Sequence, residues 1–137
     1  IRDIEKSDIL LLGVSRTSKT PTSIYLANRG YKVSNIPLVN EKSVPDKMKD
    51  IKFKPCVVGL TTEPERLYEI RRNRLTSLKE KESTEYINIK EIKKEIESSK
   101  KIFRMNKWPT IDVTRKSVEE TAASIIKIYE IKSKKNA

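Results

Sequence analysis

The amino-acid sequence predicts an α/β fold, an open and mostly parallel sheet with helices on both faces. Two observations predict this class. Short continuous apolar runs, typical of strands buried on both faces, alternate along the chain with longer segments whose apolar residues recur at helical spacing. The 137 residues suffice for one hydrophobic core, and neither a long linker nor an internal repeat divides them. Residues 1–137 are therefore expected to form a single domain.

Composition narrows the classes of function. The chain has 30 Lys and Arg against 19 Asp and Glu, a formal charge of +11, so its surface should attract nucleotides, nucleic acid or an acidic protein. It has no histidine, which excludes histidine-based catalysis and histidine-ligated metals. The single cysteine, and the lack of any apolar run near the roughly 20 residues of a membrane span, favour a soluble, cytoplasmic protein.

The first strand, expected at 9–14, leads into a loop with a phosphate-binding pattern. Gly13, Lys19 and Thr20 hold the spacing of G-x-x-x-x-G-K-[ST], in which backbone N–H groups and the lysine bind phosphates and the hydroxyl ligates magnesium. Ser18 stands where the pattern has its second glycine. Because a strand precedes the loop and a helix follows it, we predict a P-loop kinase-like nucleotide-binding domain. The expected nucleotide-binding residues are Gly13, Val14, Ser15, Arg16, Thr17, Ser18, Lys19 and Thr20.

A helix and two further strands are expected after this loop. Proline is well tolerated in a first helical turn, so Pro21 starts a helix that Thr20 caps and that ends at Arg29, before a left-handed Gly30. The next strand is expected at Lys32–Ile36.

A polar segment separates this strand from the next one. Residues 37–52 are interpreted as a surface excursion. Lys54–Thr61 is again a continuous apolar run and therefore a buried strand. Cys56 within it is expected to be a core residue, as free cysteines usually are.

A helix expected over Pro64–Leu78 carries two arginines within its apolar face. At about 100° per residue, Arg71 and Arg74 fall close to Leu67. Arginine is rarely buried without a partner. Either the two side chains reach the edge of the apolar stripe or pair with carboxylates, or they lie at the strand ends and bind phosphate. The sequence leaves both interpretations open.

The last third of the chain is expected to hold two helices around a fourth strand. Asn88 and Glu91 open a helix whose lysines and glutamates face water, so that this helix only covers the sheet. The strand is expected at Trp108–Val113. Ser117 and Glu120 then form a capping box for the final helix.

Three polar clusters follow the predicted strands at 13–20, 61–63 and 112–115. Because ligands of open parallel sheets bind beyond the carboxyl ends of the strands, the three clusters should converge on one edge. Their chemistry suits phosphoryl transfer, in which catalysis is mostly positioning and neutralisation of charge.

Candidate roles follow from these positions. Lys19 would contact the outer phosphates, Thr20 would ligate magnesium, and Arg16 would stabilise transition-state charge together with one of the two helical arginines. Asp112 would be a base or a metal contact. The candidate catalytic residues are Lys19, Arg16, Asp112, Arg71 and Arg74. For Asp112 a structural role is equally open, namely capping the Ser117 turn or pairing with Arg115.

Three long stretches carry a family resemblance. They are 13–39 (GVSRTSKTPTSIYLANRGYKVSNIPLV), 57–75 (VVGLTTEPERLYEIRRNRL) and 108–125 (WPTIDVTRKSVEETAASI). In this order they closely resemble the bacterial and plant pyruvate, phosphate dikinase regulatory proteins, a family that includes the phosphoenolpyruvate synthase regulatory proteins.

The resemblance implies a bifunctional enzyme. One activity is an ADP-dependent serine/threonine protein kinase that inactivates the dikinase by phosphorylating an active-site threonine. The other is a phosphate-dependent pyrophosphorylase that removes this phosphoryl group and releases pyrophosphate. The implied ligands are ADP and phosphate, with Mg²⁺ from the loop pattern, and the implied partner is the dikinase or the synthase. In this family, serine at position 18 is the usual form of the nucleotide-binding loop.

The family's members are roughly twice as long as this chain, which resembles their C-terminal part. The first residue, Ile1, is not methionine, which favours a fragment or a split reading frame that retains nucleotide binding. A homodimer stays open. Other open functions are a P-loop small-molecule kinase and an incomplete nucleotide-binding fragment without activity. A nucleic-acid module is disfavoured, because only 6% of the residues are aromatic and stacking platforms are not evident.

Overall fold

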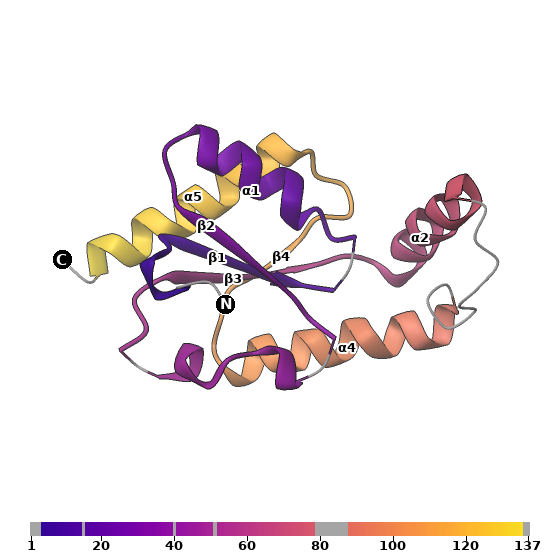
Figure 1. The fold of residues 1–137 in the computed structure, drawn as a ribbon, viewed down its shortest axis with the longest axis horizontal. Helices are drawn as coiled ribbons and strands as arrows, with labels where there is room; N and C mark the ends of the chain where they lie inside the picture. The colour runs from indigo at the N-terminus through magenta and orange to yellow at the C-terminus, as the bar shows by residue number, and fades with distance from the viewer. Residues whose placement is uncertain (1–3, 15, 40, 51, 79–87, 136–137) are drawn as a thin grey trace.

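The computed structural model describes residues 4–14, 16–39, 41–50, 52–78 and 88–135. Within this part, four parallel strands form a sheet in the order β2-β1-β3-β4 (Figure 1). The strands are β1 (Ile9–Gly13), β2 (Val33–Pro37), β3 (Cys56–Thr61) and β4 (Thr110–Asp112). Their bounds differ from the predicted ones by at most two residues at either end. The predicted α/β class is confirmed.

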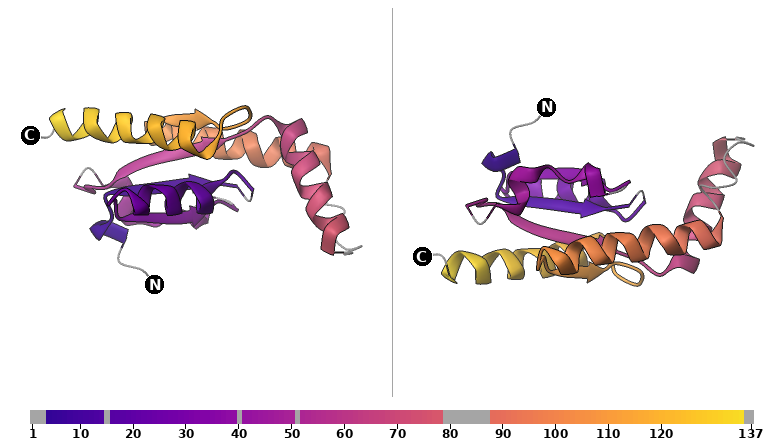
Figure 2. Two further views of the ribbon diagram at one scale, coloured as in Figure 1. Left: turned by 90° about the horizontal axis from the view of Figure 1, so that it is seen from above. Right: turned by 90° about the horizontal axis from the view of Figure 1, so that it is seen from below.

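Helices lie on both faces of the sheet. They are α1 (Lys19–Asn28), α2 (Pro64–Leu78), α4 (Ile89–Met105) and α5 (Val118–Lys135). α1 and α5 lie side by side on one face, whereas α4 covers the opposite face and α2 stands at the edge where the strands end (Figure 1, Figure 2). No helix in the described ranges is both long enough and apolar enough to cross a membrane.

The strands are apolar throughout because both faces of the sheet are buried. In β1, Leu11 packs with the residues of the α1 and α5 side, and Leu12 packs with those of the α4 side. On the α4 side, a Cβ atom on Gly59 of β3 would lie 2.5 Å from the ring of Phe103. The absence of a side chain at Gly59 therefore lets α4 pack directly against β3.

The first helix starts earlier than the sequence predicts. We expected Pro21 to follow a capping Thr20, but the helix begins at Lys19 and Thr20 is already helical. The reason is Ser18, which adopts a left-handed backbone and whose carbonyl accepts a hydrogen bond from the Thr22 N–H at 3.1 Å. Pro21 still lies in the first turn, where backbone N–H groups have no helical partner.

Other predicted helix ends are confirmed. α2 has the expected bounds, Pro64–Leu78. α1 ends at Asn28, one residue before the predicted end, and the predicted left-handed Gly30 follows Arg29 with a φ of 95°. The Asn88 side chain accepts two backbone N–H groups of the first turn of α4, at 2.9 and 3.3 Å. The Ser117 and Glu120 side chains each accept the other's backbone N–H, at 3.1 and 3.2 Å, which is the predicted capping box.

Residues 37–52 are not a purely surface excursion, so that prediction was wrong. Leu38, Val44 and Met48 are all at most 5% exposed and belong to the hydrophobic core. The described residues of this segment form two short 3-10 helices, Glu41–Ser43 and Asp46–Lys49. Its apolar residues follow neither a helical nor a strand period, which is why the pattern did not reveal their burial.

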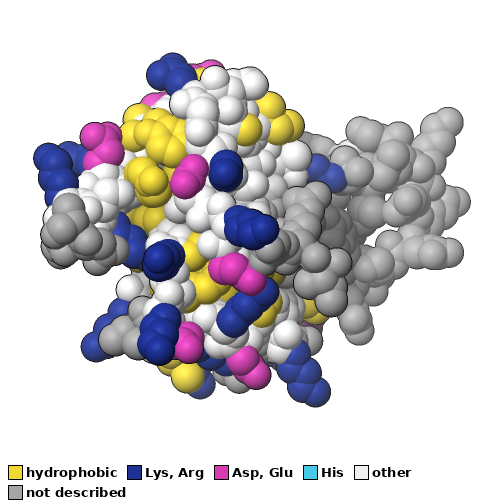
Figure 3. Space-filling model, turned by 60° about the vertical axis from the view of Figure 1, so that its left-hand side comes forward, with side chains coloured by type: hydrophobic (Ala, Val, Ile, Leu, Met, Phe, Trp, Pro, Cys, Tyr) yellow, Lys and Arg dark blue, Asp and Glu magenta, His cyan; other side chains and the backbone are white. Residues whose placement is uncertain are grey.

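The edge of the sheet at which the strands begin, opposite the edge beside α2, is hollowed. Two hollows of about 570 and 770 Å³ share Phe53, Cys56 and Lys132. Figure 3 shows Lys and Arg side chains around hydrophobic ones on this side. Lys132 Nζ donates to the carbonyl oxygens of Lys54 and Pro55 at 3.3 and 2.8 Å, which ties α5 to the start of β3.

Cys56 is buried in the core, as predicted, and burial raises the pKa of its thiol.

The direction in which the chain adds strands to the sheet reverses between the neighbouring strands β1 and β3. From β1 the chain passes through α1 to β2 on one side, and from β3 it passes through α2 and α4 to β4 on the other. In open α/β sheets the crevice outside the carboxyl ends of two such strands is the usual ligand site. The loops that follow β1 and β3 are therefore the expected ligand-binding position.

Candidate functional site

The loop after β1 is tightly folded around Gly13. A Cβ atom at this position would lie 2.6 Å from Thr17 Oγ1 and 2.9 Å from the carbonyl oxygen of Leu60 in β3. The Thr17 hydroxyl, which is fully buried, donates to the Val14 carbonyl oxygen at 2.8 Å. The Gly13 carbonyl oxygen accepts the N–H of Leu38 at 2.8 Å. Only glycine fits where the loop leaves the sheet.

In the described part of the loop, two residues have a left-handed backbone. The φ angles are 70° at Arg16 and 64° at Ser18. Such angles are uncommon outside glycine because Cβ approaches the following carbonyl oxygen. Ser18 occupies the position of the second glycine of the phosphate-loop pattern, and its backbone has the conformation that glycine adopts most easily.

Lys19 is buried against this loop. Its side-chain nitrogen donates to the Val14 carbonyl oxygen at 2.7 Å and to Thr17 Oγ1 at 3.4 Å. The pKa of Lys19 is lowered from 10.5 to about 8, mainly by burial and in addition by the positive charges of Arg71 and Arg16. Two of the predicted arginines therefore lie close enough to Lys19 to act on its charge.

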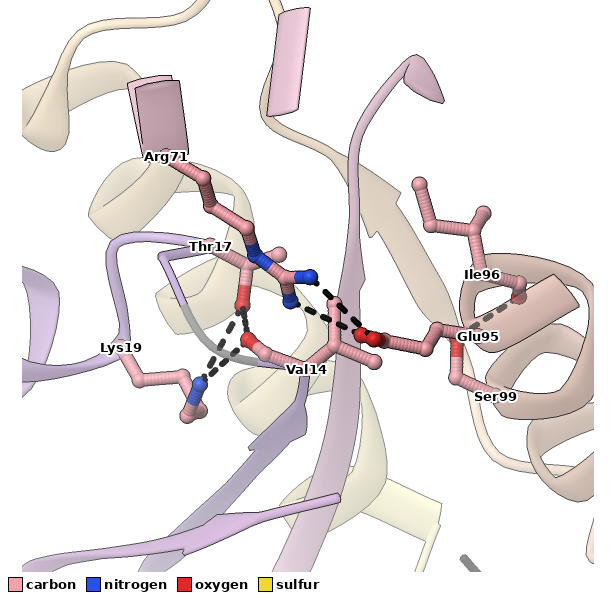
Figure 4. Close-up of polar contacts among 7 residues, drawn as sticks. All are labelled: Val14, Thr17, Lys19, Arg71, Glu95, Ile96 and Ser99. Atoms are coloured by element: carbon pink, nitrogen blue, oxygen red, sulfur yellow. Dashed lines mark hydrogen bonds and ion pairs between the residues drawn. The ribbon is translucent and has the colours of Figure 1, made fainter. Parts of the chain in front are cut away.

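Arg71 is 1% exposed and pairs with Glu95 of α4. In Figure 4 its side chain extends from α2 to a position between the loop and Glu95. Pairing with a carboxylate, one of the two interpretations left open by the sequence, is thus confirmed for Arg71. The prediction that the glutamates of α4 only face water was wrong for Glu95, which is 35% exposed. The side chain of Arg74 lies outside the described part of the chain, as does Ser15.

The clusters after β3 and β4 contact each other. Thr62 Oγ1 and Thr114 Oγ1 are 3.0 Å apart, and Thr114 Oγ1 also accepts the Glu63 N–H at 2.8 Å. Asp112 accepts the Thr114 N–H at 2.9 Å and also bonds to its hydroxyl, so it caps this turn and not the Ser117 turn. Arg115 pairs with Glu63 at 3.9 Å, not with Asp112. Both structural partners that we considered for Asp112 were therefore wrong.

A family model described as kinase/pyrophosphorylase matches residues 1–126 of this chain. The chain belongs to this family. Within the kinase/pyrophosphorylase family, the chain is similar to curated relatives that carry the name "Putative pyruvate, phosphate dikinase regulatory protein". The relative from Pelagibacter ubique (strain HTCC1062) is 70% identical over 131 residues, which are 96% of this chain and 48% of the relative.

Other relatives of the kinase/pyrophosphorylase family bear the same name. The protein from Erythrobacter litoralis (strain HTCC2594) is 56% identical over 91% of this chain and 45% of its own length. The protein from Maricaulis maris (strain MCS10) is 55% identical over 92% of this chain and 45% of its own length. The chain therefore spans about half the length of the curated relatives it matches.

The sequence predicted the loop of the candidate site but not the participation of Glu95, the partner of Arg71. Glu95 lies 24 positions from Arg71 on a different helix, and no short motif connects the two. An available signal was the arginine itself, because an arginine inside an apolar helical face needs a nearby carboxylate. Each glutamate of the neighbouring helix was then a candidate partner.

Proposed function

We propose that this chain is the nucleotide-binding part of a bifunctional regulator of pyruvate, phosphate dikinase or phosphoenolpyruvate synthase. In one reaction the β-phosphoryl group of ADP passes to the hydroxyl of an active-site threonine of the target enzyme, leaving AMP. In the other, inorganic phosphate attacks the phosphothreonine, which restores the hydroxyl and releases pyrophosphate. Membership of the kinase/pyrophosphorylase family and the names of the relatives support this proposal.

The observation that carries the proposal is the position of the loop between β1 and α1. The loop lies at the carboxyl ends of the strands, beside the point between β1 and β3 where the strand order reverses. Open α/β sheets bind ligands at this point. The positive charges of Arg16 and Arg71 both act on Lys19 there. Such an arrangement favours a polyanion over a neutral ligand.

The roles of the cations follow from their surroundings. At neutral pH a lysine with a pKa of about 8 is about nine-tenths protonated, so Lys19 is a cation that can bind the outer phosphates. Its bond to the Val14 carbonyl is the contact that a phosphate oxygen would replace. Arg16, which is exposed on the loop, and Arg71 would stabilise transition-state charge. Asp112 stays our candidate for a base or a metal contact.

Magnesium would be held mainly by the phosphates and by water. The described ranges contain no group of three His, Cys, Asp or Glu side chains able to enclose a metal ion. Mg²⁺ in phosphoryl-transfer sites keeps several waters and uses few protein ligands, so an exposed hydroxyl such as that of Thr20 fits such a site. Bound Mg²⁺ would neutralise charge on the transferred group.

Phosphotransfer from ADP labelled in its β-phosphate to a purified dikinase tests the proposal. This chain, its Lys19→Ala variant and a full-length relative are compared. We expect label on a threonine of the dikinase and no label with Lys19→Ala. Label with the full-length relative alone would restrict this chain to nucleotide binding. Phosphorylation of a small metabolite from ATP, with no transfer to the dikinase, would instead support a small-molecule kinase.

A further inference from the structure

The ion pair of Arg71 and Glu95 joins α2 to α4 at the edge of the candidate site. Arg71 Nη1 donates to Glu95 Oε1 at 3.2 Å, and Nη2 donates to Oε2 at 2.8 Å. The arginine is 1% exposed, whereas the carboxylate is 35% exposed. Because the contact has two parallel hydrogen bonds, Glu95 fixes both the position and the orientation of the guanidinium plane.

The guanidinium that Glu95 fixes lies among other cations. The charge of Arg71 acts on Lys19, as does that of Arg16 from the loop itself. Figure 4 shows Arg71 between Lys19 and Glu95, so the carboxylate neutralises Arg71 from the side away from Lys19. Crowding of like charges lowers the stability of a protein unless an anion joins them. The loop side of the pair is therefore suited to an anionic ligand.

We propose that Glu95 is a positioning residue of the nucleotide site: it holds the Arg71 guanidinium beside the loop, where the charge strengthens binding of a nucleoside diphosphate at Lys19. Glu95 does not touch the ligand and acts through Arg71. This inference rests on the proposed function, because that function supplies the diphosphate. It adds α4 to the elements that build the site, although α4 follows the loop by about seventy residues.

Isothermal titration of the 137-residue chain with ADP at pH 7 tests the inference. Arg71→Met should weaken binding about tenfold, the equivalent of one charge-assisted contact. Glu95→Ala should weaken it about threefold or more, and Glu95→Gln less, because the amide oxygen still accepts a bond from Arg71. Adding Glu95→Ala to Arg71→Met should have no further effect. Glu97→Ala, an exposed position on the same helix, is the matched control and should bind ADP normally.

A second measurement, the pKa of Lys19, needs no ligand. The pKa of Lys19, followed by NMR of its side chain, should rise in Arg71→Met because a like charge is removed. In Glu95→Ala it should rise less than in Arg71→Met, because release of the guanidinium from the loop raises it while loss of the nearby carboxylate lowers it. It should stay unchanged in Glu97→Ala. The charged groups that act on Lys19 are Arg16 and Arg71, and Glu95 pairs with Arg71. A purely structural pair would change the melting temperature and leave the affinity for ADP unchanged in Glu95→Ala and Glu95→Gln.

The outcomes separate the two proposals. A wild-type chain that binds neither ADP nor pyrophosphate overturns the proposed function and this inference with it. A wild-type chain that binds ADP, with unchanged affinity in both Arg71→Met and Glu95→Ala, overturns only the role of Glu95. If Glu95→Ala does not fold, the affinity of Glu95→Gln for ADP decides in its place. An intermediate affinity of Glu95→Gln, between wild type and Arg71→Met, would support the inference.

Discussion

Replacing Lys19 by methionine should change how the stability of the protein depends on pH. In the unfolded chain this lysine has its ordinary pKa of 10.5, whereas in the folded chain the pKa is about 8. Between these two values the unfolded state binds more protons than the folded state. The free energy of unfolding of the wild type must therefore rise with pH across this window.

The size of the effect follows from the lowering of the pKa. The full difference corresponds to about 3 kcal/mol, of which about 2 kcal/mol is gained between pH 7 and 9.5. Lys19 is only 9% exposed, so solvent screens its charge little. In Lys19→Met the titrating group is gone, while the length and apolar stem of the side chain are kept. The wild type should thus gain about 2 kcal/mol relative to the variant over this pH range.

Urea unfolding at pH 7, 8, 8.75 and 9.5 would measure this difference, with the single tryptophan, Trp108, as the fluorescent probe. Lys93→Met, at an exposed position of α4, is the matched control and should follow the wild-type profile. Titration of the other lysines and tyrosines is common to all three proteins and cancels. Parallel profiles for wild type and Lys19→Met would refute the reasoning, because they would mean that Lys19 is solvated and not buried against the loop.

Three further substitutions test the loop and its helix. Gly13→Ala places a Cβ within 3.0 Å of two atoms, one of them backbone, and should destabilise the chain by about 3 kcal/mol in urea unfolding; a loss below about 0.5 kcal/mol would contradict the tight loop. Ser18→Gly removes the cost of a left-handed serine and should raise the melting temperature by a few degrees, equivalent to about 0.5–1 kcal/mol. Thr22→Val removes a buried hydroxyl that has no hydrogen-bond partner in the described ranges and should stabilise by about 1 kcal/mol. Chemical denaturation checks the last change, and a destabilised variant would show that the hydroxyl is bonded.

The sheet and most helix ends could be predicted because their signals are local. A strand buried on both faces is a continuous apolar run, and β3 retains that signature in Cys56–Thr61. The capping box of Ser117 and Glu120 depends on residues three positions apart, so the sequence alone contains it. These elements position the loop, and the place of the candidate site could therefore be predicted together with them.

What the sequence could not provide depends on contacts between distant segments. The start of α1 at Lys19 follows from the left-handed Ser18, in a loop that packs against Leu60 of β3. The partner of Arg71 is on another helix, and no periodic pattern identifies Glu95 among the other glutamates of α4. The burial of Lys19 also arises only when the loop folds back on Val14. Such features are set by tertiary packing, which overrides local preference.

The central claim is that the phosphates of ADP bind to the loop between β1 and α1. Titration of the ¹⁵N-labelled chain with ADP, followed by amide NMR spectra, tests it most directly. We predict that the largest shifts fall on Val14, Thr17 and Lys19, and that they vanish in Lys19→Ala. Shifts confined to the opposite edge of the sheet, around Phe53 and its neighbours, or no shifts at all, would contradict the claim.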